Sequence, residues 1–314
     1  MHKGFKRGIL AVLLCLALAL VSAGCSSTQE KSSSAEAVTG ETVYPLTVQD
    51  DFGQEVTFDK EPEKVVSLSP ANTEILFALE ASDKIAGRTD YCNYPEEAAQ
   101  VESIGDYNAP NIEKIISLSP DLVLATDFIS DDVRAQIEAT GAKVMVFTAT
   151  DIPTVQDEII RVGQILNVND QAAAITGDMQ KKYEALKEKT AGAKTKKSVF
   201  VDIGDYYRSG DGSLLGTMLT DINADNIAAG TGMAWPQMSV EQIIAANPDV
   251  YVSFLTEPDV IKAVPGFDQV NAIKNDQIYF YEMLSPDSDL IQRPGPRIVD
   301  GLELLAKDIY PELF

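Results

Sequence analysis

Two acidic residues recur at matching places in a repeated pattern, and they are the first candidates for a chemical role. Glu113 lies in PNIEKIISLSPDLVLAT and Glu241 in MSVEQIIAANPDVYVSF, and the shared pattern Glu-x-Ile-Ile-x3-Pro-Asp recurs after 128 residues without a gap. A reused helix-to-strand turn accounts for the isoleucines, the proline and the aspartate. It accounts less well for the acid, because the helix dipole favours an N-terminal acid only mildly. The pattern alone leaves a helix-end role and a role in partner contacts equally open.

Catalytic and metal-binding chemistry finds little support in the remaining residues. The single histidine is His2, at the very start of the chain, which excludes a histidine-ligated zinc or manganese site, a Ser-His-Asp triad and histidine ligation of haem iron. A tyrosinate ligand to haem remains open. Cys92, between Tyr91 and Asn93, is more typical of a packed small residue than of a nucleophile. We therefore expect a protein that is not an enzyme and carries no metal or cofactor of its own.

Length and charge limit the partners. A chain of 314 residues is long enough for two domains, and its 45% hydrophobic content is that of an ordinary globular protein. The formal net charge of −23 argues against a nucleic-acid partner, whose phosphates require a basic face, and against adsorption to anionic lipid.

The N-terminus has the order of a signal peptide. Basic residues at positions 3, 6 and 7 precede an apolar run from Gly8 to Val21, which is too short to span a bilayer comfortably. Small residues then lead to Cys25, and this order resembles the lipobox of bacterial lipoproteins, in which the peptidase cuts before the cysteine and the thiol receives a lipid. We expect a signal peptide over 1–24 and a lipidated, disordered tether over 25–43. An uncleaved anchor helix is the alternative.

The rest of the chain alternates between strands and helices, which predicts an α/β fold with largely parallel sheets. YPLTVQDDFGQEVTF predicts an opening hairpin, and KVVSLS, DLVLAT, KVMVFT, SVFVDIG and QIYFYE predict buried strands. NDQAAAITGDMQKKYEALKEKT predicts one long helix, rich in good helix formers. We expect an N-terminal Rossmann-like lobe over 44–168, a linking helix over 169–191, and a C-terminal lobe over 192–314 that ends in an amphipathic helix.

Four ordered motifs resemble those of a known family. VVSLSPANTEILFAL, DYCNYPEEA, NIEKIISLSPDLVLAT and WPQMSVEQIIAANPDV are similar to the substrate-binding components of ABC importers for cobalamin, haem and ferric siderophores, and most similar to the cobalamin-binding members. The resemblance implies two α/β lobes joined by a single long helix, with the ligand in the cleft between them. It also implies an extracytoplasmic protein, anchored to the membrane through Cys25 and monomeric.

The same resemblance suggests a role for the repeated acid. In the cobalamin system, one glutamate of each lobe docks onto arginines of a symmetric permease dimer, which works with its ATPase subunits. Glu113 and Glu241 match those positions, and a protein of two similar halves needs one acid in each half to meet a twofold partner.

The resemblance further implies a set of ligand contacts. Aromatic side chains line the corrin in the cobalamin-binding members, as suits a large flat ligand. The positions that match or can replace such contacts are Asn72, Tyr91, Tyr107, Tyr206, Tyr207 and Trp235. The chain departs from the pattern at Thr126 and Ile203, where aromatic residues can stand. Arg293 and Arg297 could reach an anionic ligand or cap the last helix, so a ferric siderophore or haem is the alternative to cobalamin.

Lipid attachment is tested by Cys25→Ser. Without the thiol there is no acceptor for the lipid, so an uncleaved precursor that takes up no labelled fatty acid is expected. Electrophoretic mobility and fatty-acid labelling measure the two effects, with Cys92→Ser as the matched control. A Cys25→Ser protein that is still cut before residue 25 and still labelled would contradict lipidation at this site.

Overall fold

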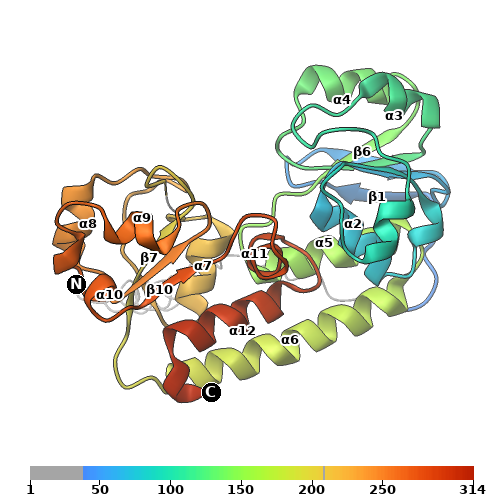
Figure 1. Cartoon of the computed structure of the whole chain (residues 1–314). Coiled ribbons are helices and arrows are strands. Elements are labelled where there is room, and N and C mark those ends of the chain that lie inside the picture. Colours follow the sequence, from blue (N-terminus) through green and yellow to red (C-terminus); the bar gives the residue numbers. More distant parts are fainter. Residues whose placement is uncertain (1–37, 208) are drawn as a thin grey trace, which may run out of the picture. The chain divides into compact units, whose positions relative to one another are not determined.

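Two parallel sheets of four strands each organise the part of the chain that the structure describes, residues 38–207 and 209–314 of a computed structural model (Figure 1). The strand order is β4-β3-β5-β6 in the first sheet and β8-β7-β9-β10 in the second. In both sheets the first strand of the chain lies between the second and the third, and the fourth strand is at the edge beyond the third. The bounds are β3 Val65–Ser67, β4 Ile85–Arg88, β5 Leu122–Ala125, β6 Lys143–Val146, β7 Ser198–Asp202, β8 Asp225–Asn226, β9 Val250–Ser253 and β10 Ile278–Phe280.

The α/β fold with parallel sheets is thus as predicted, and so is the opening hairpin. β1 (Leu46–Gln49) and β2 (Glu55–Phe58) pair antiparallel around the predicted turn. The amide of Asp51 in this turn donates to the carbonyl of Val146, the last residue of β6. The hairpin is thereby joined to the end of the first sheet.

The repeated pattern forms the same turn twice. α3 (Ile112–Leu118) precedes β5, and α8 (Val240–Ala246) precedes β9. Each helix ends on a residue with positive φ, 50° at Ser119 and 47° at Asn247, which turns the chain from helix into strand.

The repeated aspartate closes each turn against a neighbouring strand. Asp121 Oδ2 accepts hydrogen bonds from the amides of Glu63 and Lys64, just before β3, at 2.9 and 3.0 Å. Asp249 Oδ2 accepts from the amide and the hydroxyl of Ser198, the first residue of β7, at 3.1 and 3.0 Å. The aspartate of the pattern therefore fixes the start of the first strand in both sheets.

The isoleucines of the pattern are less uniform than expected. Ile115 and Ile243 are fully buried, but Ile116 is exposed and Ile244 is half-buried. Only the first isoleucine of each pair is therefore part of the core. A helix of seven residues turns only one side chain of an adjacent pair toward the sheet.

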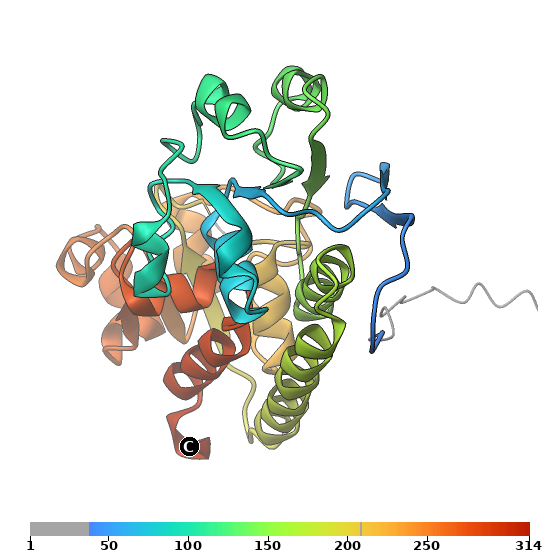
Figure 2. The same ribbon diagram turned by 90° about the vertical axis from the view of Figure 1, so that its right-hand side faces the viewer.

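Helices α5 (Ile152–Ile165) and α6 (Asn169–Ala191) carry the chain from the first sheet to the second. They approach closely at Gly163, where an added Cβ would lie 2.5 Å from the Cβ of Ala172. α12 (Ile298–Ile309) packs beside α6 in both views (Figures 1 and 2). A role for α6 as the single link between lobes stays a prediction.

The remaining helices flank the sheets and complete the core. Their bounds are α2 Pro70–Ala78, α4 Asp131–Glu138, α7 Leu214–Asp221, α9 Pro258–Lys262, α10 Asn271–Lys274 and α11 Pro286–Gln292. The largest buried cluster joins apolar side chains of both sheets to those of α5, α6 and α12. Two smaller clusters cover the other face of each sheet, one around Val66 and Val123 and one around Phe200 and Tyr251. Both faces of each sheet are therefore buried, as parallel sheets require.

The chain enters this body at the junction of α5 and α6. The amide of Gly40 donates to Asp170, that of Thr42 donates to Asn167, and the Tyr44 hydroxyl donates to the carbonyl of Ile165. The predicted tether over 25–43 is therefore too long at its end, because residues 40–43 already belong to the folded body. Cys25 and the predicted signal peptide lie outside the described residues. Within the described ranges, no helix is both long and apolar enough to cross a membrane.

A buried carboxyl group joins α5 to the hairpin. Glu158 is almost fully buried, and its Oε1 has no hydrogen-bond partner among the residues described. Burial and the neighbouring Asp51 carboxylate raise the pKa of Glu158 well above its ordinary value of 4.5. Asp51 itself is bound by Arg161 at 2.6 Å and by the amide of Thr148 at 2.7 Å.

The Glu158→Gln variant tests whether folding raises the pKa of Glu158. An acid whose pKa is raised on folding binds more protons in the folded state, so its contribution to stability is complete below pH 4.5 and is lost as pH rises through the folded pKa. Glutamine has no such proton to lose, and Glu158→Gln is expected to raise the unfolding free energy at neutral pH by about 1–3 kcal/mol. Urea unfolding between pH 4 and pH 9 measures it. If wild type and variant keep a constant difference across that range, Glu158 does not titrate as described.

Candidate ligand-binding site

Exposed apolar side chains gather in the loops that follow the strands. Because all strands of a parallel sheet point the same way, these loops lie at one edge of the sheet, the usual ligand-binding edge of open α/β sheets. Most of the large apolar side chains that are exposed in the described residues lie there: Tyr91, Tyr94, Phe128, Tyr207, Met233, Trp235, Leu255, Met283 and Leu284. The carboxyl edges of both sheets thus present apolar and aromatic surface to solvent.

At the first sheet, the side chains of Tyr107 and Phe128 are in direct contact. Their rings meet edge to face with centroids 5.2 Å apart. The Tyr107 hydroxyl lies 3.3 Å from the hydroxyl of Thr126, which follows β5 directly. Burial raises the pKa of Tyr107, so its phenol stays neutral. Tyr91 is more exposed, and its hydroxyl donates to Asp106 at 3.3 Å.

Asn72 has a different environment from the one predicted. Its side chain is buried, and its amide donates to the carbonyl of Ala125, the last residue of β5, at 3.3 Å. Its backbone amide donates to the hydroxyl of Ser69, which caps α2. In this structure Asn72 joins α2 to β5, and a contact between Asn72 and a ligand stays a prediction.

At the second sheet, the predicted aromatic residues come from two loops that are bonded to each other. Tyr207 pairs with Gln237 in an antiparallel bridge, and the amide of Met238 donates to the carbonyl of Tyr206. Tyr206 packs against Phe267 with centroids 6.4 Å apart. Trp235, which comes just before these contacts in the second loop, is 53% exposed. Tyr207 and Trp235 therefore offer accessible aromatic surface, whereas Tyr206 is largely part of the core beneath them.

A small cavity of about 260 Å³ opens beside this aromatic surface. Asp202 and Asp205, with Tyr206 and Thr256, line its polar part. The Asp202 carboxylate is buried and accepts from the amide of Gly204 and the hydroxyl of Tyr251, both at 2.9 Å. Burial raises the pKa of Asp202. This end of the site is acidic in character, which disfavours an anionic group of a ligand.

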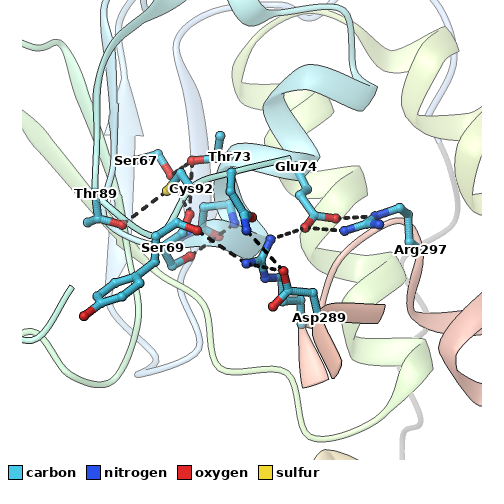
Figure 3. A network of polar contacts seen from close by, with 12 residues as sticks. Ser67, Ser69, Thr73, Glu74, Thr89, Cys92, Asp289 and Arg297 are labelled. Carbon is cyan, nitrogen blue, oxygen red and sulfur yellow. Dashed lines mark hydrogen bonds and ion pairs between the residues drawn. The ribbon is translucent and has the colours of Figure 1, made fainter. Parts of the chain in front are cut away.

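The two arginines considered for an anionic ligand are already paired with carboxylates (Figure 3). Arg297 makes a two-point contact with Glu74 of α2, from Nε to Oε2 and from Nη2 to Oε1, each 2.8 Å. Arg293 Nη1 donates to the same Oε1 at 2.9 Å, and its Nη2 lies 2.7 Å from Asp289. Two positive and two negative groups thus balance each other. Arg297 occupies the N-cap position of α12 as the capping alternative expects, but its side chain makes no capping hydrogen bond there.

The repeated glutamates lie apart from these residues, on the helices before β5 and β9. Glu113 and Glu241 each occupy the second position of their helix, α3 and α8, and both side chains are exposed. Hydrogen bonds from its own amide and from Ser239 lower the pKa of Glu241. Both positions are accessible to a partner protein.

Several residues of the surface were not predicted from the sequence. Phe128, Leu255, Met283 and Leu284 are exposed apolar side chains that each follow a strand within a few residues. That position was the available signal. No group of three or more potential metal ligands occurs within residues 38–207 and 209–314.

Comparison with known proteins gives consistent matches over most of the chain. Residues 65–283 match the family model described as periplasmic binding protein. An uncharacterized ABC transporter substrate-binding lipoprotein of Bacillus subtilis, YvrC, is 38% identical, with 98% of each chain covered. A vitamin B12-binding protein of Salmonella typhi is 30% identical over 75% of this chain and 86% of its own length.

A solved structure adds a match in three dimensions. The crystal structure of a possible iron-binding (periplasmic solute-binding) protein from Staphylococcus epidermidis superposes with a TM-score of 0.71 at 29% identity. The match covers 80% of this chain and all of the other.

Proposed function

The chain belongs to the periplasmic binding protein family, and from this premise we propose that it captures cobalamin and delivers it to the permease of an ABC importer. Its role as the substrate-binding protein of an ABC transporter follows from the family and the relatives, which are named as binding proteins rather than enzymes. The identity of the cargo, cobalamin, is the part that we propose.

The observation that carries the proposal is the exposed aromatic and apolar surface at the carboxyl edges of both sheets. A monomeric protein rarely leaves such side chains in contact with water unless a ligand or partner covers them. Tyr91 and Phe128 supply it at one edge, beside the half-buried Tyr107, and Tyr207 and Trp235 supply it at the other. A large, flat, mostly apolar molecule such as a corrin suits two such walls.

Charge supports a cargo without carboxylates. Arg293 and Arg297, which might have met an anion, are neutralised by Glu74 and Asp289, and the cavity at the second sheet contains Asp202. Cobalamin carries amide side chains, whereas haem and many ferric siderophores carry negative charge. Haem or a ferric siderophore is the second candidate, favoured by the likeness to the structure titled as possibly iron-binding.

The location and the partners complete the proposal. The relative from Bacillus subtilis is named a lipoprotein, in keeping with an extracytoplasmic protein anchored to the membrane, here through Cys25. Glu113 and Glu241 are proposed to dock onto a permease dimer that works with its ATPase subunits. We propose a monomer, in which the two exposed acids meet the two halves of that dimer.

Ligand titration tests the cargo. Isothermal calorimetry with cyanocobalamin, haemin and several ferric siderophores is expected to give the tightest binding for cobalamin. Trp235→Ala should lose about 1–3 kcal/mol of binding free energy through lost aromatic burial. Phe52→Ala is the matched control, because Phe52 is equally exposed but lies on the β1–β2 turn. Tight binding of a siderophore with no heat from cobalamin would reassign the cargo.

Charge reversal tests the docking surface. Glu113→Lys and Glu241→Lys are each expected to abolish uptake, because a reversed charge across an interface costs several kcal/mol as an order of magnitude. Ligand affinity should stay within a few-fold of wild type. Glu188→Lys on α6 is the matched control, since Glu188 is also an exposed helical acid. Normal uptake by a protein carrying both reversals would remove the docking role.

A further inference from the structure

One short segment of the connection that follows β4 is held in place by side chains from the far end of the sequence. The segment is Tyr91–Tyr94, within the motif DYCNYPEEA. Arg293 Nη2 donates to the carbonyl of Tyr91 at 3.3 Å. The side-chain amide of Asn93 donates to Asp289 Oδ2 at 3.4 Å. These groups lie about 200 residues apart in the chain, so they are joined only by the fold.

Of the two remaining residues, Tyr94 is also held from the far end of the sequence, and Cys92 has a local contact. The guanidinium of Arg297 stacks on the ring of Tyr94 at 3.5 Å from its centroid. The buried thiol of Cys92 lies 3.2 Å from the hydroxyl of Thr89 (Figure 3). Each of the four residues thus has its own contact, although the segment belongs to no helix or strand.

Arg293 is the centre of this arrangement. Its guanidinium is 9% exposed and binds the carboxylates of Glu74 and Asp289 together with the Tyr91 carbonyl. A planar guanidinium presents its N–H donors in a rigid fork that fixes the directions of its acceptors, whereas a lysine ammonium group has three donors on a flexible stem and no such fork. Since Glu74 is buried in α2, the carbonyl of Tyr91 is set relative to a rigid element.

The position of Tyr91 explains why this segment makes so many contacts. It is 39% exposed at the carboxyl edge of the first sheet, where the proposed function places the ligand. An aromatic wall contributes to affinity only if its main chain is held before the ligand arrives, since ordering it on binding costs free energy. The segment lacks the main-chain ladder that would hold a strand.

We propose that Arg293 is a positioning residue for the ligand: with Glu74 and Asp289 it holds the main chain of Tyr91–Tyr94, so that Tyr91 is preorganised and ligand binding is coupled to α11 and α12. This inference rests on the proposed function for its ligand, but its geometry does not depend on which ligand is bound. It assigns the arginine pair to placing a contact rather than to binding an anion.

The test is Arg293→Lys, which keeps the charge that balances Glu74 and Asp289 but loses the planar fork. Affinity for cyanocobalamin is expected to fall about tenfold, a change of about 1.4 kcal/mol. In a Tyr91→Ala background the same substitution should have almost no further effect, because it acts through Tyr91. Equal losses in both backgrounds would overturn the proposal, and so would unchanged affinity in Arg293→Lys.

The chain contains a closely matched control in Arg134. Arg134 is 7% exposed and also binds two carboxylates, Asp50 and Glu138, and one main-chain carbonyl, that of Val144. Arg134→Lys should destabilise the fold to a similar degree in urea unfolding yet leave ligand affinity unchanged. A similar loss of affinity in both variants would show general destabilisation and would refute a specific role for Arg293.

A ligand-free measurement separates this proposal from the choice of cargo. Hydrogen exchange of a peptide spanning residues 89–95 is expected to be faster in Arg293→Lys than in wild type and unchanged in Arg134→Lys. If no candidate ligand binds wild type, the cargo assignment fails while this measurement still decides the positioning role. If Arg293→Lys does not fold, Asn93→Ala removes one surface contact of the same segment and should weaken binding by about threefold. Unchanged exchange in a folded variant would overturn the proposal.

Discussion

Parallel strand pairing is the constraint on which the rest of this structure depends. A parallel pair cannot be closed by a tight turn, so each strand is followed by a crossover that returns the chain to the starting edge. The carboxyl ends of four strands therefore meet at one edge of each sheet, where loops must lie. Both faces are buried by helices, which leaves that edge as the place where apolar side chains such as Phe128 and Trp235 remain exposed.

Buried charged side chains hold together parts of the chain that strand pairing does not connect. Glu74, Arg293, Arg297 and Asp289 form a balanced group, and breaking one partner of such a group leaves a buried charge that costs about 3–5 kcal/mol. Replacement by lysine is milder because the charge remains. The group binds α2 to the segment before α12.

Sequence reasoning went furthest where periodicity and local turn chemistry determine structure. It predicted the hairpin, the strands from KVVSLS to QIYFYE and the terminal helix, and the structure confirms them. It identified Asp121 and Asp249 as a pair but not their partners, which lie over 50 residues away. The burial of Asn72 and the pairing of Arg297 with Glu74 were beyond it, because both depend on how distant segments pack. Of the surface at the carboxyl edges, it named Tyr91 and Trp235 but missed Phe128 and Leu255.

The topology of the repeat places its two acids, Glu113 and Glu241, relative to the carboxyl edges of the sheets. A helix that precedes an inner strand of a parallel sheet runs opposite to that strand, so it begins on the side of the carboxyl edge. α3 precedes β5 and α8 precedes β9, and both sheets share one strand order, so Glu113 and Glu241 are placed alike at the starts of these helices. Glu113 therefore lies at the end of α3 that is on the side of the carboxyl edge with Tyr107. Glu241 lies at the end of α8 that is on the side of the carboxyl edge with Trp235.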